Sequence, residues 1–252
     1  MPGSFVQSGE VKTYFEEYGE GKPFVMLHGD SWNIEHFANQ IAYFSDKFRL
    51  ILPERRGHGR TPDVSGAWTY EVFANDTIAF LDALGLESVH LLGHSGGADI
   101  ALLVTIRRPD LVDRLIPVSG DAPSYVLSEE QKSRIRSRTV EDFRKQAPPI
   151  VESNERVTPD GVKRFPAMYK KSKELWTTDW TVTPEQLGSI KSPTLVMLAD
   201  RDFGSVEEAA TLFRMIPNAQ LCVVPRATHG LMGMRSEVVN PIIMDFLTTP
   251  LT

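Results

Sequence analysis

Short apolar runs alternate with amphipathic stretches in the first 120 residues and again after residue 188. The runs expected to form strands are 24–28, 48–52, 89–92, 115–118, 194–198 and 221–224. Apolar residues recur at helical spacing over 33–45, 70–84, 100–107, 206–216 and 237–247. Alternation of strands and helices predicts an α/β protein with a mostly parallel sheet covered on both faces. The segment 11–18 is expected to be an antiparallel edge strand, and Pro117 is a local misfit in its strand because proline removes a backbone donor.

Residues 121–187 break this alternation. They contain no good strand and many charged residues, and Phe165, Met168 and Tyr169 fall on one helical face. This pattern predicts a helical cap insertion that lies on the sheet. The expected core is therefore 1–120 together with 188–252.

Composition and charge narrow the class of protein. The chain has 252 residues, of which 41% are hydrophobic, and 27 basic against 33 acidic residues give a net charge of −6. An acidic balance argues against nucleic acid as the partner, since phosphate binding needs a basic face. Cys222 is the only cysteine, and no spacing suggests a metal site. The first ten residues lack a basic segment followed by an apolar one, so we expect no secretory signal, and no apolar run approaches the ~18 residues that a membrane helix needs. We expect a soluble cytoplasmic protein without metal or cofactor.

A glycine-rich turn with a serine at its centre lies between an expected strand and an expected helix. Residues 93–97 have the sequence GHSGG, which matches the pattern G-x-S-x-G. A serine on such a sharp turn projects its hydroxyl above the strand end, and the glycines let the chain approach itself closely. The N–H of Gly96, at a helix N-terminus, points into the same space, where it can stabilise a negatively charged oxygen. The motif predicts that Ser95 is a nucleophile.

A serine nucleophile needs a base, and the base needs an acid to orient it. Among the six histidines, only His229 both comes after the serine and lies beyond the end of a late strand. Asp202 follows the preceding strand and is the preferred acid, while Asp121 and Asp200 stay open as alternatives. Activity is expected to fall at acidic pH because only neutral imidazole can act as the base.

Several segments together resemble one fold superfamily. They are His28–Gly29, Arg56–Gly59, Gly93–Gly97, Pro193–Val196, Asp202 and His229–Gly230. Over nearly its whole length the chain resembles the α/β-hydrolase fold superfamily, and residues 54–63 are similar to its small bacterial serine esterases and lactonases. The resemblance implies that the backbone N–H of Asp30 is the second donor to an oxyanion, beside Gly96. A carboxylate there would repel the oxyanion unless it is paired or turned away, so Ser31 is the alternative donor.

The predicted function is hydrolysis of a small-molecule carboxylic ester through an acyl-enzyme intermediate. Residues expected to bind the substrate are Trp32, His94, Phe203, Met168 and Trp176. A lactonase acting on acyl-homoserine or macrolide-type lactones would need the same machinery, as would hydrolysis of a carbon–carbon bond. A different class, a ligand receptor with slow or no turnover, is also open.

Overall fold

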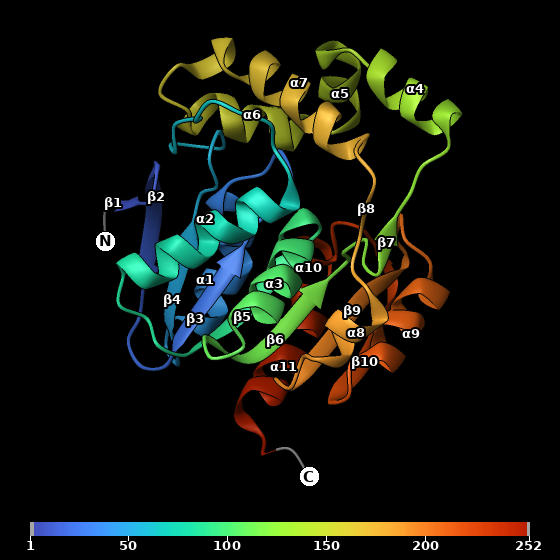
Figure 1. Ribbon diagram of the computed structural model, residues 1–252. Coiled ribbons are helices and arrows are strands. Elements are labelled where there is room, and N and C mark those ends of the chain that lie inside the picture. The colour runs from blue at the N-terminus through green and yellow to red at the C-terminus, as the bar shows by residue number, and fades with distance from the viewer. Residues whose placement is uncertain (1–2, 251–252) are drawn as a thin grey trace.

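A computed structural model describes residues 3–250 and contains a twisted eight-stranded sheet with helices on both faces (Figure 1). The strands are β1 (Ser4–Ser8), β2 (Val11–Tyr18), β3 (Pro23–Leu27), β4 (Arg49–Pro53), β5 (Val89–His94), β6 (Val112–Val118), β9 (Thr194–Arg201) and β10 (Ala219–Thr228). Their order in the sheet is β1-β2-β4-β3-β5-β6-β9-β10. From β4 to β10 all neighbours are parallel, whereas β2 is antiparallel to both β1 and β4. The predicted α/β fold class is confirmed.

Alternate residues along the strands belong to two apolar clusters, one on each face of the sheet. The helices of the sheet domain are η1 (Ile34–Phe37), α1 (Ala38–Phe44), α2 (Tyr70–Ala83), α3 (Gly96–Arg107), α9 (Val206–Met215), α10 (Leu231–Met234) and α11 (Ser236–Thr248). In β3, Val25 and Leu27 pack with α2 and α3, while Phe24 and Met26 pack with α1 and α11. This follows from the two-residue period of a strand. Each large apolar side chain buried in this way stabilises the fold by about 1.5–3 kcal/mol.

A helical segment (residues 124–188) leaves the sheet after β6, returns before β9 and lies over the carboxyl ends of the strands (Figure 1). It contains β7 (Ser124–Tyr125), α4 (Glu129–Ser137), α5 (Val140–Gln146), α6 (Pro148–Val157), η2 (Gly161–Lys163), α7 (Phe165–Trp176), β8 (Trp180–Thr181) and α8 (Pro184–Gly188). Phe165, Met168 and Tyr169 are buried in the cluster that the segment shares with the sheet domain. Their predicted common face is therefore the packed face of α7.

Three local expectations need correction. β2 is not the edge strand, because β1 pairs outside it, and β1 is mostly exposed with too few apolar residues to show a pattern. Residues 121–187 do contain strands, but β7 and β8 have two residues each, too few to show a two-residue period. Helix α3 begins at Gly96 instead of residue 100, since the turn at Ser95 leads straight into it. Pro117 is accommodated in β6. The pairing of β6 with β9 places Leu115 opposite Thr194 and Val118 opposite Met197, and Pro117 has no partner in it.

Candidate active site

Ser95 lies on a sharp turn between β5 and α3. Its backbone has φ 56° and ψ −131°, a conformation that a non-glycine residue adopts only when its surroundings hold it there. The Ser95 N–H donates to Val118 O at 2.8 Å. A Cβ on Gly93 would lie 2.0 Å from Gly97 O, so the turn can close only with glycine at residue 93.

A chain of two hydrogen bonds joins Ser95, His229 and Asp202. The Ser95 Oγ lies 3.0 Å from His229 Nε2, and the His229 Nδ1 lies 2.6 Å from Asp202 Oδ1. A carboxylate accepts only, so Asp202 fixes the tautomer in which Nδ1 carries the proton and Nε2 is free to accept from the serine. The three residues come from the ends of β5, β9 and β10, which meet at the carboxyl edge of the sheet.

The carboxylate of Asp202 is held by further donors. Its side chain is 2% exposed and accepts from Ser119 Oγ at 2.5 Å and from the N–H of Phe203 at 2.8 Å. Burial works to raise the pKa of Asp202, but the hydrogen bonds from His229 and Ser119 outweigh it and lower the pKa to about 2. Asp202 is therefore ionised throughout the neutral range and can stabilise a protonated His229.

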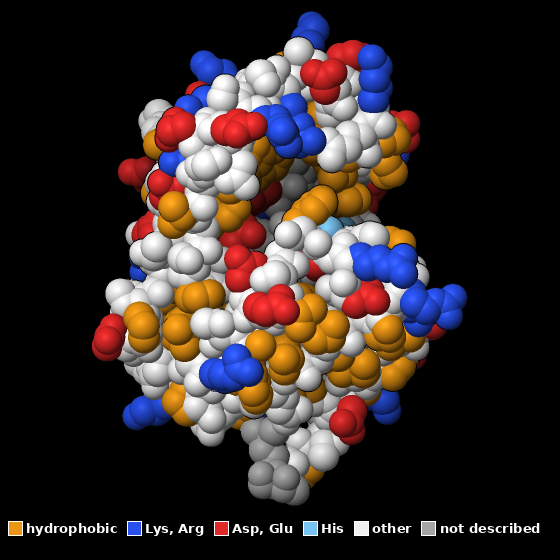
Figure 2. All heavy atoms as spheres, turned by 90° about the vertical axis from the view of Figure 1, so that its right-hand side faces the viewer, with side chains coloured by type: hydrophobic (Ala, Val, Ile, Leu, Met, Phe, Trp, Pro, Cys, Tyr) orange, Lys and Arg blue, Asp and Glu red, His pale blue; other side chains and the backbone are white. Residues whose placement is uncertain are grey.

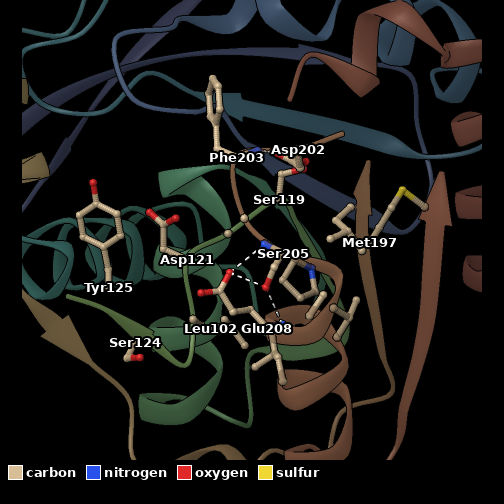
Figure 3. Close-up of a pocket in the computed structure, with 18 of the residues that line it drawn as sticks. Leu102, Ser119, Asp121, Ser124, Tyr125, Met197, Asp202, Phe203, Ser205 and Glu208 are labelled. Atoms are coloured by element: carbon tan, nitrogen blue, oxygen red, sulfur yellow. Dashed lines mark hydrogen bonds between the residues drawn. The ribbon is translucent and has the colours of Figure 1, made fainter. Parts of the chain in front are cut away.

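The two alternative acids lie near the site, but no hydrogen bond joins either of them to His229 within residues 3–250. The Asp200 carboxylate accepts from the N–H of Ala227 at 3.0 Å. Asp121 lines a pocket of about 380 Å³ beside Asp202, and Figure 3 shows its carboxylate pointing into that pocket. Burial, followed by the negative charge of Asp30, raises the pKa of Asp121 to about 7, although His229 acts to lower it. Of the three candidates, Asp202 is the one that the structure brings to His229.

Two backbone N–H groups lie close to Ser95, because Gly96 follows it in the chain and Gly29, the residue before Asp30, packs against it: a Cβ added on Gly29 would lie 3.1 Å from Ser95 Cβ. Within residues 3–250, the N–H groups of Asp30 and Gly96 donate no hydrogen bond. The alternative donor, the N–H of Ser31, is occupied, because it donates to His58 Nε2 at 3.3 Å. The geometry favours the pair Asp30 and Gly96.

The side chain of Asp30 is paired, as the sequence required of a carboxylate in this place. It accepts from Arg55 Nη1 at 2.9 Å, Tyr70 OH at 3.0 Å and Trp176 Nε1 at 2.9 Å. The carboxylate packs against Gly96, where an added Cβ would lie 2.4 Å from Oδ1. The side chains of Asp30 and Arg55 are 6% and 4% exposed, so this buried charge is compensated where it stands.

Two of the residues expected to bind substrate, Phe203 and Trp176, lie beside residues of the site. Phe203 is 84% exposed and its ring lies 4.7 Å from that of His229, and Trp176 reaches Asp30 from α7. Trp32 is half-buried beside His36, with ring centroids 4.6 Å apart.

The expectation for His94 is wrong. Its side chain is 1% exposed, and its Nε2 lies 2.8 Å from the backbone O of His229. His94 therefore contacts the backbone of His229 and is too buried to contact a ligand. Met168 is likewise buried, in the cluster that joins α7 to the sheet domain, and is absent from the lining of the pocket beside Asp202.

The sequence analysis did not identify the residues that donate hydrogen bonds to the carboxylates of Asp202 and Asp30. Ser119 follows β6 at the same sheet edge as Ser95 and Asp202, and this position is a signal that could have indicated it. Nothing in the sequence pairs Asp30 with Arg55 or Tyr70, because these residues are distant along the chain and meet only in the fold.

A hollow opens between the helical segment and the sheet domain, with acidic and apolar side chains around it and a histidine side chain at its border (Figure 2). Within residues 3–250, no group of three or more His, Cys, Asp or Glu residues is arranged to hold a metal ion. No helix in that range is both long and apolar enough to span a bilayer.

Comparison with known proteins identifies the family. A model of the alpha/beta hydrolase family matches residues 24–241, so the chain belongs to that family. It is 25% identical to a non-heme haloperoxidase from Rhodococcus erythropolis, over 95% of this chain and 97% of the relative. It is also 25% identical to a putative carbamate hydrolase from Agrobacterium fabrum, over 93% and 97% of the two chains. Among solved structures, a thermophilic esterase from Thermogutta terrifontis superposes with a TM-score of 0.80 at 23% identity, covering 98% of each chain.

Proposed function

We propose that this protein is a serine hydrolase that cleaves carboxylic esters through an acyl-enzyme intermediate. Ser95 is the nucleophile, His229 the general base and Asp202 the residue that orients the imidazole. The observation that carries the proposal is the hydrogen-bond chain from Ser95 Oγ through His229 to Asp202, at 3.0 and 2.6 Å. Membership of a hydrolase family supports it, as do the N–H groups of Asp30 and Gly96, which donate no hydrogen bond to any residue from 3 to 250.

In the first half-reaction the Ser95 oxygen attacks the ester carbonyl while its proton moves to His229 Nε2. The N–H groups of Asp30 and Gly96 donate to the oxyanion that forms. The imidazolium then gives its proton to the departing alcohol, and the acyl group stays on Ser95. In the second half-reaction water loses a proton to His229 and attacks the acyl carbonyl. The bond to Ser95 Oγ then breaks, His229 returns the proton to this oxygen, and the acid leaves.

The helical segment is proposed to act as a cap over this site. Phe203, Trp32 and Trp176 would then contact the substrate, which is a small-molecule ester. A lactone is a cyclic ester and passes through the same steps, so the ring would open with both products on one molecule. The shape of the pocket, and not the chemical machinery, would separate open-chain from cyclic substrates.

The test is a panel of p-nitrophenyl esters and lactones with the purified protein and with Ser95→Ala. We expect turnover by the wild type and a loss of more than about 10³-fold in the variant. A fluorophosphonate should label the wild type at Ser95 and leave the variant unlabelled, because labelling needs an activated serine. Ser137→Ala, an exposed serine on α4, is the matched control and should keep both activity and labelling. Esterase activity that survives Ser95→Ala would refute the proposal.

A further inference from the structure

The loop that carries the Asp30 N–H is held by the helical segment. Every polar atom of Ser31, the next residue, has a partner, and two of the three partners come from α6 and α7. The carbonyl oxygen of Ser31 accepts from Asn154 Nδ2 at 2.6 Å, and its hydroxyl lies 3.1 Å from that of Ser172. The third partner, His58 of the sheet domain, accepts from the Ser31 N–H at 3.3 Å.

Ser31 needs this support because of its backbone conformation. Its φ is 61°, in the left-handed region that favours glycine, and its side chain is fully buried. A strained residue of this kind keeps its conformation only when the surrounding structure fixes it. Asn154 is itself rigid, since it is 2% exposed and its amide also donates to Ile150 O of its own helix at 2.8 Å.

A further bond from the same segment reaches Asp30. Trp176 Nε1 on α7 donates to Asp30 Oδ2 at 2.9 Å. Two adjacent residues, Asp30 and Ser31, are therefore joined by three hydrogen bonds to helices α6 and α7 of the helical segment. The Asp30 N–H belongs to the Gly29–Asp30 peptide, whose carbonyl oxygen accepts from the Trp32 N–H at 3.2 Å. The Trp32 N–H in turn shares a peptide plane with Ser31 O, the acceptor of the Asn154 bond. The bond from Asn154 therefore holds the turn that sets the direction of the Asp30 N–H.

We infer that Asn154 is a positioning residue: through Ser31 it aims the Asp30 N–H at the oxyanion, so that the helical segment completes the oxyanion hole. The inference rests on the proposed function, because it assumes that an oxyanion forms beside Ser95. Docking of α6 and α7 thus serves the chemical step itself as well as enclosing the substrate. The affected quantity is kcat, since the oxyanion exists only in the transition state and the intermediate.

The test compares Asn154→Ala with Lys171→Met. Lys171 on α7 also ties the segment to the sheet domain, at 2.5 Å from Asp63 Oδ2 and 3.2 Å from Gly66 O, but away from the oxyanion loop. For an ester substrate we expect Asn154→Ala to lower kcat about 10-fold or more with KM within about two-fold, against the 10²–10³-fold cost of losing an oxyanion donor outright. Lys171→Met should keep kcat within about two-fold.

A trifluoromethyl ketone, which forms a tetrahedral adduct with an active serine, gives a second readout. Its inhibition constant should weaken in Asn154→Ala by the same factor as kcat and stay unchanged in Lys171→Met. If Asn154→Ala does not fold, Ser172→Ala removes one hydroxyl and should show the same kcat-specific loss at about three-fold. Equal effects of the Asn154 and Lys171 variants, or a loss confined to KM, would overturn the inference. Absence of ester turnover in the wild type would instead overturn the proposed function.

Discussion

The hydroxyl of Ser119 lies 2.5 Å from Asp202 Oδ2, whereas His229 bonds to the other oxygen of the same carboxylate. Figure 3 shows Ser119 and Asp202 side by side at the edge of the pocket. Ser119 has a φ of 53°, so it is held in an unfavourable conformation that keeps its hydroxyl on the carboxylate. Ser119 thus limits the orientations open to Asp202.

Ser119→Ala should weaken both catalysis and stability. Loss of a hydrogen bond to a charged group costs about 1.5–3 kcal/mol, and part of this is recovered by the donors that remain, so we expect kcat to fall about 5-fold. Asp202 has a folded-state pKa of about 2, so its contribution to stability is present above the unfolded pKa of about 3.9 and is lost as the pH falls toward 2. The destabilisation by Ser119→Ala should accordingly be seen at pH 7 and shrink near pH 2. Denaturant unfolding at both pH values measures this.

Ser124→Ala is the control for that experiment, since Ser124 lines the same pocket but is exposed. It should leave kcat and stability within error of the wild type. A Ser119→Ala variant whose stability deficit is equal at pH 2 and pH 7 would contradict the assigned role.

Asp121 should shape the pH dependence of the reaction. Burial and the charge of Asp30 raise its pKa to about 7, while His229 opposes the rise, so the Asp121 charge and the imidazolium favour each other. An ionised Asp121 favours the imidazolium, which cannot act as the base. Asp121→Asn should therefore move the acidic limb of the kcat/KM profile to lower pH. Profiles between pH 5 and 9 measure the shift.

Glu207→Gln is the matched control, because Glu207 is an exposed carboxylate on α9 and solvent screens its charge. Its acidic limb should coincide with that of the wild type. An acidic limb in Asp121→Asn that does not move, or moves to higher pH, would rule out this coupling.

Asp99 is a buried carboxyl that organises the chain after β6. It is fully buried on α3, and its Oδ1 accepts from the N–H groups of Asp121 at 2.9 Å and Ala122 at 3.2 Å. Burial, reinforced by the charge of Asp121, raises the pKa of Asp99 well above its ordinary value. Its folded-state pKa therefore exceeds the unfolded one, so the wild type loses stability as the pH rises from about 4.

Asp99→Asn keeps the acceptor and removes this loss, so its stability relative to the wild type should improve between pH 5 and pH 8. Asp99→Leu leaves the N–H groups of Asp121 and Ala122 without their acceptor and should cost about 2–4 kcal/mol at pH 5. The cost should be smaller at pH 8, because the leucine also removes the carboxyl whose ionisation destabilises the wild type. Urea unfolding at pH 5 and 8 distinguishes the variants. A wild type and an Asp99→Asn variant with parallel pH dependence would contradict the raised pKa.

The sequence was sufficient to predict the line of hydrogen bonds through Ser95, His229 and Asp202. A glycine-rich turn has few conformations, and parallel strands bring their carboxyl ends to one edge. Residues just after separate strands therefore meet even when they are distant in the chain. The same logic placed Asp200 and Asp121 near the site but could not choose among them, because the choice depends on side-chain direction over a few ångströms.

The environment of Asp30 could not be predicted in the same way. Its three partners, Arg55, Tyr70 and Trp176, come from a loop and two helices that no local pattern relates. The side chain of His94 could not be placed from the local sequence either. We expected the residue before the nucleophile to contact the substrate, whereas the turn directs its side chain to the backbone oxygen of His229. Contacts formed by packing between elements are visible only in the folded chain.

The two glycines after Ser95 should respond differently to alanine, because they face different neighbours. On Gly97 a Cβ would lie 2.3 Å from Leu27 O, which belongs to the backbone of β3 and cannot move without distorting the sheet. On Gly96 it would lie 2.4 Å from Asp30 Oδ1, at the end of a side chain. Overpacking of this kind typically costs about 1–3 kcal/mol, and the backbone clash should cost more than the side-chain clash. Gly97→Ala should therefore be the more destabilised variant, with little folded protein.

Gly96→Ala should fold, but its Asp30 carboxylate must leave its three donors, and the adjoining N–H turns with it. We expect a loss of at least about 10²-fold in kcat, comparable to removal of an oxyanion donor, together with a lower melting temperature, because a buried carboxylate is displaced from its partners. Gly233→Ala is the control, since its added Cβ meets no atom within 4 Å; it should leave activity unchanged and stabilise α10 by at most about 1 kcal/mol. Circular dichroism melts and ester kinetics on the three variants test the order. A Gly96→Ala protein with wild-type kcat would show that the Asp30 carboxylate and its N–H are not mechanically linked to Gly96.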